Sequence, residues 1–483
     1  MQWLLGNLLA GLADRSDSID AGLVITGLAD DSRKVRVGNL FLAIPGSCQN
    51  GVKFARQALQ NGAVAVVAQD PAPQEFKESW IQVPDALQAR LILAQTYYNN
   101  PFRHLRMHGV TGTSGKTTTA FLMDAMLRMS GRKTALLGTV YLKIGDKIQP
   151  AELTTPGVLE LHAFAAEAVN AGCTDWVMEV SSHALHQGRI AGLSFDFCLF
   201  SNLSRDHLDY HPDMEAYYQA KRLLFAQYCR GVAIVNVDDP HGTRLAQELS
   251  AQHAPLLRVS RMDQKADLWP NSIRHDANGL HLDFPAASSQ PLTSPLYGDF
   301  NADNIILACG WAIACRLPAS AIEQALRETR VPGRFEMVFN DGQRKALVDY
   351  AHKPDALQRL LASVRTLCSG RLLLVFGCGG DRDHGKRPMM GEIAETGADY
   401  CFVTSDNPRT ENPETIIQEI CAGMRLQNHQ VIVDRREAIL YACQMLGVGD
   451  WLVVAGKGHE SYQIVGTEKH HFDDREILRE ALP

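Results

Sequence analysis

Residues 106–121 read RMHGVTGTSGKTTTAF and join an expected strand to an expected helix through a glycine-rich turn. In such a turn, backbone N–H groups and the start of the following helix surround an anion. A lysine adds a positive charge, and the next threonine hydroxyl can reach magnesium. Val110 stands where the usual phosphate-loop pattern has glycine, and a turn that only caps a helix is the structural alternative. The strand–turn–helix context favours a phosphate site formed by Gly112, Gly115, Lys116 and Thr117.

The composition is that of a folded protein with several domains. The chain has 483 residues, 46% of them hydrophobic and 21% charged, which predicts two to four domains. A net charge of -7 argues against nucleic acid as the main partner. The 11 cysteines are scattered without a CxxC pair, so neither a zinc site nor a disulfide framework is indicated.

The first 20 residues, MQWLLGNLLAGLADRSDSID, lack a basic leader and a small-residue cleavage site. We therefore expect an amphipathic helix there and not a signal peptide. No stretch of the sequence reaches the length that spans a bilayer. We expect a cytoplasmic monomer that neither inserts into a membrane nor binds nucleic acid.

Strands alternate with helix-length stretches in three successive segments, which predicts an α/β protein with parallel sheets. In the first segment, the apolar strand AVAVVA at 63–68 indicates a sheet that is covered on both faces. Turn residues in YYNNPFRHL, 97–105, indicate a linker to the second segment. We assign the domains to residues 1–100, 101–330 and 331–483.

Four expected strands of the third segment end on residues that suit a ligand. These positions are Asp349, 377–380, Asp406 and 456–458. Ligands of doubly wound sheets bind at the carboxyl ends of the strands. Glycines at strand ends are also common in purely structural sheets, so it is the four positions together that indicate a second ligand-facing edge.

The loop TGTSGKT resembles that of the Mur ligases and their folylpolyglutamate synthase relatives. Seven further stretches follow in the order typical of that family: MEVSSH, SNLSRDHLDYH, YYQAKRLLF, GDFNADN, PGRFE, DYAHKPDAL and FGCGGDRDHGKRP. The chain is identified as a member of the Mur ligase family, most similar to its MurE-type, diaminopimelate-adding branch. It departs from the family pattern at Ser114, Leu153 and Lys353.

The resemblance implies three domains: a small N-terminal α/β UDP-binding domain, a central phosphate-loop ATPase domain with a parallel sheet, and a C-terminal Rossmann-like doubly wound domain. It also implies a reaction. ATP phosphorylates the γ-carboxyl of D-glutamate in UDP-N-acetylmuramoyl-L-Ala-D-Glu, and the amine of meso-diaminopimelate attacks the acyl phosphate. Because the phosphate and the carboxylate repel each other, cations must neutralise both.

The family pattern assigns the catalytic and ATP-binding residues. The catalytic set is Lys116, Glu179, His207 and Lys221. Magnesium would be held by Thr117, Glu179, His207 and Lys221, the last as a carbamate, since an unprotonated lysine amine can add carbon dioxide. A solvated helix lysine is the plain alternative for Lys221. ATP would contact Gly112, Thr113, Ser114, Gly115, Lys116, Thr117, Thr118, Asn301, Arg334, Asp349 and His352.

The same pattern assigns two further sets of contacts. The UDP-sugar peptide would contact Ser32, Ser47, Cys48, Gln49, Thr154, Thr155, Ser181, Gln187 and Arg189. The incoming amino acid would contact Arg387, Asp406, Asn407, Pro408, Arg409, Gly456 and Glu460. Arg409 can grip the distal carboxylate of diaminopimelate with its planar fork, and Glu460 would take the ammonium. The Asn-Pro composition of this stretch also fits a simple turn.

Two alternatives remain open. One is a lysine-adding relative or another Mur or folylpolyglutamate-type ligase, against which DNPR and GKGHE argue. The other is a module that binds ATP and a partner protein without making a peptide bond. Such a module would not need Lys221, His207 and the amino-acid contacts together.

Overall fold

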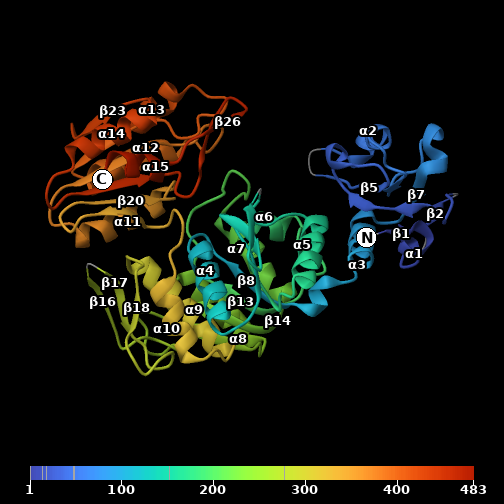
Figure 1. The fold of residues 1–483 in the computed structure, drawn as a ribbon, viewed down its shortest axis with the longest axis horizontal. Helices are drawn as coiled ribbons and strands as arrows, with labels where there is room; N and C mark the ends of the chain where they lie inside the picture. The colour runs from blue at the N-terminus through green and yellow to red at the C-terminus, as the bar shows by residue number, and fades with distance from the viewer. Residues whose placement is uncertain are drawn as a thin grey trace.

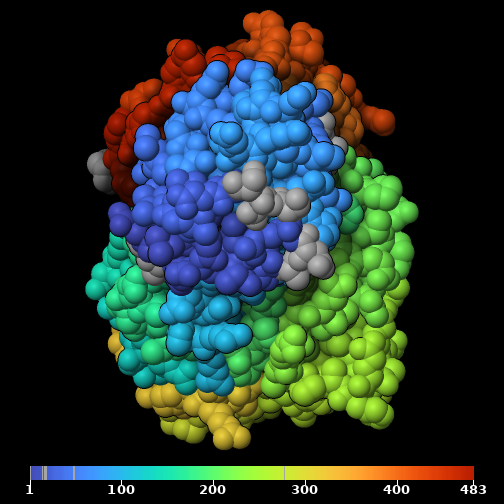
Figure 2. Space-filling model, turned by 90° about the vertical axis from the view of Figure 1, so that its right-hand side faces the viewer, coloured from blue at the N-terminus to red at the C-terminus, as the bar shows by residue number. Residues whose placement is uncertain are grey.

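The structure is a computed structural model that describes residues 2–12, 15–17, 19–46, 49–151, 153–276 and 278–482. Three α/β units follow one another along the chain (Figure 1). The N-terminal unit lies at one end of the long axis, the C-terminal unit lies toward the other end, and the central unit lies between them. Figure 2 views the N-terminal end, where the first unit stands in front of the rest. The predicted three-domain α/β architecture is confirmed.

The N-terminal unit has one sheet with helices on both faces. Its elements are β2 (Ser16–Asp17), β4 (Gly27–Ala29), β5 (Asn39–Ala43), α2 (Ala55–Gln60), β6 (Ala65–Ala68), β7 (Trp80–Gln82) and α3 (Ala86–Tyr97). The strand order is β2-β7-β6-β5-β4, parallel except at β2. Alternate residues of β5 and β6 pack against α3 on one face and α2 on the other. The prediction of a sheet covered on both faces is confirmed.

The N-terminal helix is shorter than the sequence indicates. Residues Trp3–Leu4 form strand β1, which pairs with β3 (Val24–Ile25), and only Leu5–Leu9 form helix α1. Trp3 and Leu4 pair with β3, whereas Leu5, Leu8 and Leu9 of the short helix are buried in the core against α3.

The central unit is an eight-stranded sheet in the order β11-β10-β9-β12-β8-β13-β14-β15. Its strands are β8 (Arg106–Thr111), β9 (Thr134–Leu137), β10 (Tyr141–Ile144), β11 (Lys147–Pro150), β12 (Asp175–Glu179), β13 (Phe195–Phe200), β14 (Cys229–Asn236) and β15 (Leu256–Val259). All neighbours from β9 to β15 are parallel, as predicted, and the β10–β11 hairpin extends one edge antiparallel.

Helices cover both faces of the central sheet, which explains its apolar strands. The helices are α4 (Lys116–Met129), α5 (Val158–Asn170), α6 (Ser182–His186), α7 (Met214–Leu223), α8 (Pro240–Ala251), α9 (Asp299–Ala314) and α10 (Ala319–Glu328). One core packs α4, α9 and α10 against the sheet, and the other packs α5, α7 and α8. A small antiparallel sheet, unexpected from the sequence, joins the first core through β16 (Ser272–Asp276), β17 (Gly279–Asp283) and β18 (Leu292–Ser294).

The C-terminal unit is a six-stranded sheet in the order β19-β20-β24-β21-β22-β23. Its strands are β19 (Glu336–Asn340), β20 (Lys345–Asp349), β21 (Leu372–Phe376), β22 (Tyr400–Val403), β23 (His429–Val431) and β24 (Trp451–Ala455), followed by the hairpin β25 (Tyr462–Val465) and β26 (Glu468–His471). Only β19 is antiparallel within the sheet. The expected strand at 431–434 lies two residues earlier, because its pairing with β22 begins at His429.

Helices on both faces make this unit doubly wound, as predicted. They are α11 (Pro354–Leu367), α12 (Lys386–Gly397), α13 (Pro413–Cys421), α14 (Arg435–Met445) and α15 (Asp474–Ala481). The first three pack on one face and the last two on the other. A fully buried ion pair joins α14 to α15, with 2.7 Å between Arg435 Nη2 and Asp474 Oδ2.

Replacing Asp474 by asparagine should destabilise the C-terminal unit by about 3–5 kcal/mol, because it leaves the buried Arg435 charge uncompensated. Native-state hydrogen exchange of the β24 amides measures this. The matched control is Glu480→Gln, which breaks the Arg436–Glu480 pair between the same two helices at the surface. Surface pairs contribute little, so the control should behave like the parent. Equal effects of the two substitutions would contradict the prediction.

Candidate active site

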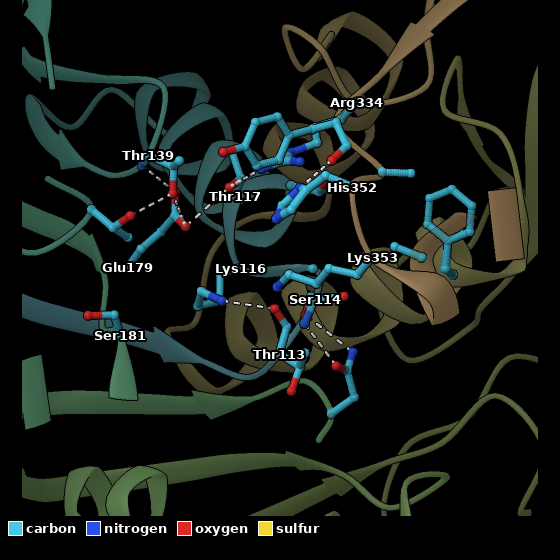
Figure 3. A pocket seen from close by; sticks show the side chains of 18 of the residues that line it. Thr113, Ser114, Lys116, Thr117, Thr139, Glu179, Ser181, Arg334, His352 and Lys353 are labelled. Atoms are coloured by element: carbon cyan, nitrogen blue, oxygen red, sulfur yellow. Dashed lines mark hydrogen bonds between the residues drawn. The ribbon is translucent and has the colours of Figure 1, made fainter. Parts of the chain in front are cut away.

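A cavity of about 510 Å³ opens between the central and C-terminal units. Figure 3 shows the phosphate loop and Glu179 on the central side, facing Arg334, His352 and Lys353 from the C-terminal side. Its walls contain most of the residues predicted for ATP: Thr113, Ser114, Gly115, Lys116, Thr117, Thr118, Arg334, Asp349 and His352.

The phosphate loop connects β8 to the first turn of α4. Gly115 caps α4 with a φ of +87°, a conformation that favours glycine. Lys116 Nζ donates to the carbonyls of Gly112 at 2.8 Å and Thr113 at 3.0 Å. Burial, and next the charge of Lys353, lower the pKa of Lys116 to about 8. The Lys116 side chain thus folds back onto its own loop, and a bound phosphate would draw its ammonium away from these two carbonyls.

Glu179 ends β12 and is almost fully buried beside the loop. Its carboxylate accepts hydrogen bonds from the Thr117 hydroxyl at 3.1 Å and from the Thr139 amide at 2.8 Å and hydroxyl at 3.1 Å. Within the described residues it makes no ion pair. A buried carboxylate without a cation, next to a hydroxyl and open to the cavity, fits a divalent cation. Thr139 was not predicted, because only the fold brings it within hydrogen-bonding distance of Glu179.

His207 lines the same cavity from the loop after β13. Its Nε2 lies 2.9 Å from Asp206 Oδ2, and Asp206 also pairs with Lys353 of the C-terminal unit. Hydrogen bonds and charge from His207 and Lys353 outweigh burial and hold the pKa of Asp206 well below its usual range. The imidazole thus lines the same cavity as Thr117 and Glu179, although no three His, Cys, Asp or Glu side chains of the described residues lie together as a metal-binding group.

Lys221 lies on α7 beneath the loop and is not a solvated helix lysine. It is almost fully buried, its Nζ donates to Gly112 O at 2.8 Å, and it lies 4.7 Å from the centre of the Tyr217 ring. Burial, and next the charge of Lys116, lower the pKa of Lys221 well below its usual range. A lowered pKa favours the unprotonated amine that carbamate formation needs.

The C-terminal wall is organised around Arg334. Its Nη2 donates to the Thr117 hydroxyl at 3.3 Å, and its guanidinium stacks on Tyr350 at 4.3 Å. Asp349 accepts the amides of Phe335 and Ala351, both at 2.7 Å, and so fixes the turn that carries Arg334. Burial raises the pKa of Asp349.

The predicted asparagines lie on the other side of the loop. Asn304 lines the cavity next to Gly115, and its Nδ2 donates to Asn301 Oδ1 at 3.1 Å. Asn301 does not line the cavity; its amide donates to Tyr297 O at 2.8 Å. In this arrangement Asn301 positions Asn304. The sequence pattern could not show that only the second of these two asparagines lines the cavity.

The residues predicted for the sugar peptide form a second network on the central unit. Thr155 Oγ1 donates to Glu179 O at 2.9 Å and accepts the Ser181 amide at 3.1 Å. Arg189 donates to Thr155 O at 3.1 Å and to Gln187 Oε1 at 2.9 Å. The cavity is lined by Thr154, Thr155, Ser181 and Arg189. Gln187 does not line it but accepts the hydrogen bond from Arg189.

Of the residues predicted in the N-terminal unit, Ser32 and Gln49 line neither cavity. Ser32 is buried and donates to Gln57 Oε1 at 2.8 Å. Gln49 is an exposed loop residue of the same unit. Ser47 and Cys48 lie outside the described residues.

A second cavity, about 460 Å³, lies along the carboxyl ends of the C-terminal strands. The two cavities share His183, His207, Tyr350, His352, Lys353 and Arg382 in their walls. Asp406, Asn407, Arg409, Gly456 and Glu460 line the second cavity, as predicted for the amino-acid site. Arg409 Nη1 donates to Gly380 O at 2.7 Å.

Two predicted amino-acid contacts do not line this cavity. Arg387 is fully buried and pairs with Glu411 at 2.9 Å and Glu419 at 2.6 Å. Pro408 is absent from the wall. Arg382 and Lys386, from the same glycine-rich stretch as Arg387, lie in the wall instead. The sequence held a signal for them, since both belong to FGCGGDRDHGKRP.

Comparison with known proteins gives matches along most of the chain. Family models described as the Mur ligase family catalytic domain, the Mur ligase middle domain and the Mur ligase glutamate ligase domain match residues 24–98, 110–312 and 333–458. No helix in the described part of the chain is long and apolar enough to cross a membrane.

Named relatives carry one shared name, UDP-N-acetylmuramoyl-L-alanyl-D-glutamate--2,6-diaminopimelate ligase. The protein of Gloeobacter violaceus is 46% identical over 465 residues, covering 95% of this chain and 94% of that protein. The protein of Thermosynechococcus vestitus is 46% identical over 466 residues, covering 95% and 93%. A solved structure with the same name is 33% identical, with a TM-score of 0.69 and coverage of 100% and 99%.

Replacing Gly115 by alanine should weaken binding of a magnesium–nucleoside triphosphate by on the order of 100-fold, about 2.7 kcal/mol. A Cβ at Gly115 would lie 2.2 Å from Asn304 Oδ1, so the loop or the asparagine must move. Isothermal titration with ATP measures the loss. The control is Gly131→Ala after the other end of α4, where φ is +82° but no atom lies within 4 Å. Equal binding by both variants would show that the crowding at Gly115 is irrelevant.

Proposed function

This chain belongs to the Mur ligase family, and we propose that it adds meso-diaminopimelate to the γ-carboxyl of D-glutamate in UDP-N-acetylmuramoyl-L-alanyl-D-glutamate. It is an ATP-dependent, ADP-forming ligase of peptidoglycan precursor synthesis. The observation that carries the proposal is the junction of the two cavities. The cavity at the phosphate loop and the cavity proposed for the amino acid share six wall residues, so a carboxylate activated in one would lie near an amine bound in the other.

The cations around the loop would make phosphoryl transfer possible. Lys116 would swing from the loop carbonyls to the β- and γ-phosphates, and Arg334 already reaches Thr117 across the cavity. Thr117, Glu179 and His207 would hold magnesium, which when bound supplies charge neutralisation for the phosphates. The D-glutamate carboxylate would lie between Arg189 and the loop, where these cations offset its repulsion from the γ-phosphate.

We further propose that Lys221 is carbamylated. Its unprotonated amine would attack carbon dioxide, forming an N–C bond and releasing one proton, so that a neutral amine would become an anion. The resulting carboxylate would complete the magnesium ligand set. Mass spectrometry under carbon dioxide trapping conditions tests this directly.

The second cavity would bind diaminopimelate by its distal end. Glu460 and Asp406 would accept the ammonium, and Arg409 would donate to the carboxylate. Lysine has no distal carboxylate, so Arg409 would separate the two substrates. We propose further that the protein acts as a monomer in the cytoplasm.

The proposed reaction is tested by ADP release from purified protein with ATP and magnesium. Release should require both UDP-N-acetylmuramoyl-L-alanyl-D-glutamate and meso-diaminopimelate, because the acyl phosphate forms only on the bound carboxylate. Lys116→Ala should abolish it, whereas Lys147→Ala, which alters an exposed lysine of the same unit, should not. Release without either substrate, or preferential use of lysine, would refute the proposed function.

Replacing Arg409 by alanine should raise the KM for meso-diaminopimelate by roughly 30- to 1000-fold, corresponding to about 2–4 kcal/mol for a desolvated charge pair. The KM for ATP should stay near that of the parent. Steady-state kinetics with each substrate varied in turn measure both constants. Arg436→Ala, at an exposed position of the same unit, is the control. An unchanged KM for diaminopimelate would mean that Arg409 only shapes the turn.

A further inference from the structure

Lys457 is a buried cation directly behind the amino-acid pocket. It follows β24 and Gly456, and none of its surface is exposed. Its Nζ donates to Asn407 Oδ1 at 3.1 Å and to Glu460 Oε2 at 3.4 Å. A buried ammonium is costly unless it is paired, so these two partners account for its presence.

Lys457 fixes which way the Asn407 amide faces. Asn407 Oδ1 accepts from Lys457 Nζ and from the Ile464 amide at 2.9 Å. Its Nδ2 donates to Glu460 Oε2 at 2.9 Å. With its oxygen directed at two donors, the amide can present only N–H to Glu460. One carboxylate oxygen of Glu460 is thereby held, and the other has the Tyr350 hydroxyl at 3.5 Å.

Two of the carboxylates in the pocket wall, Asp406 and Glu460, contact Asn407, the residue that Lys457 holds. Asp406 accepts the Asn407 amide at 2.7 Å and lines the pocket with Glu460. Burial raises the pKa of Glu460, and the charge of Asp406 raises it further, whereas Lys457 opposes both. Tyr350, Tyr462, Arg409 and Arg435 are the other titratable or charged groups around Glu460. Arg435 is already paired with Asp474, and the cavity wall places Arg409 where a substrate carboxylate would meet it.

We propose that Lys457 is the positioning residue that sets the local charge around Glu460 in the amino-acid pocket. Its ammonium offsets part of the negative charge that Glu460 and Asp406 bring to the side of the pocket where the substrate ammonium would bind. It also keeps Glu460 ionised and aimed into the pocket through Asn407. This inference rests on the proposed function, because it assigns the pocket to the ammonium end of the incoming amino acid.

Lys457→Met should raise the KM for meso-diaminopimelate by on the order of tenfold, with a much smaller change in kcat. Without the ammonium, Glu460 takes up a proton at higher pH. The acid limb of kcat/KM for the amino acid should therefore move upward by about one pH unit. Lys457→Arg keeps the charge and should keep the acid limb near its original position. The double variant Lys457→Met with Glu460→Gln should lose the shifted limb, because the group that titrates is gone.

The control is Lys143→Met, which removes another buried lysine, paired with Asp124 in the central unit. It should lower the thermal midpoint without changing the KM or the pH profile for the amino acid. ATP titration of each variant confirms that the central unit is folded. If Lys457→Met lowers only the thermal midpoint, as the control does, the lysine is structural and the inference is wrong. If the parent protein itself shows no amine-dependent ADP release, the proposed function fails instead.

Discussion

Repulsion between a triphosphate and a carboxylate is the constraint on which the arrangement of this molecule depends. Two anions must approach within bonding distance, and only converging positive charge permits that. The chain provides this charge from both sides of one cavity. Lys116 comes from the phosphate loop, whereas Arg334 and Lys353 come from the C-terminal unit. Glu179, buried without a cation among the described residues, leaves room for the metal that the remaining charge requires.

Because the positive charge is divided between two units, the contacts that join the units are part of the site. Arg334 donates to the Thr117 hydroxyl, and Lys353 pairs with Asp206 next to His207. Each contact joins a residue of the C-terminal unit to a residue beside a proposed magnesium ligand, or to the ligand itself. Movement of the C-terminal unit would therefore change the phosphate site and the amino-acid site together, as expected where closure assembles the reacting groups.

The sequence predicted the parts of the site that lie next to one another along the chain. The phosphate loop and Asp406 after β22 were predicted because a strand end is visible as an apolar run followed by polar residues, whereas Glu179 at the end of β12 was assigned from the resemblance to the Mur ligases. Thr139 and the Lys353–Asp206 pair were not found, since they join segments that only the fold brings together. Sequence spacing also could not show that Arg387 turns inward toward Glu411 while Arg382 faces the cavity.

Half of the backbone strain in the described part of the chain lies where the chemistry is proposed. Four of its eight non-glycine residues with positive φ lie in or next to a cavity wall, namely His207, Phe335, Asp381 and Arg409. Such conformations cost roughly 1–3 kcal/mol each and persist only where surrounding contacts impose them. At Arg409 those contacts are its amide bonded to Ile464 O at 3.1 Å and its carbonyl accepting from Gly466 at 2.8 Å. The β25–β26 hairpin thus holds the arginine in place before any substrate arrives. The Ile464 amide also donates to Asn407, which in turn donates to Glu460. The same hairpin therefore positions Arg409 and, through Asn407, Glu460, the groups proposed for the carboxylate and the ammonium of the amino acid.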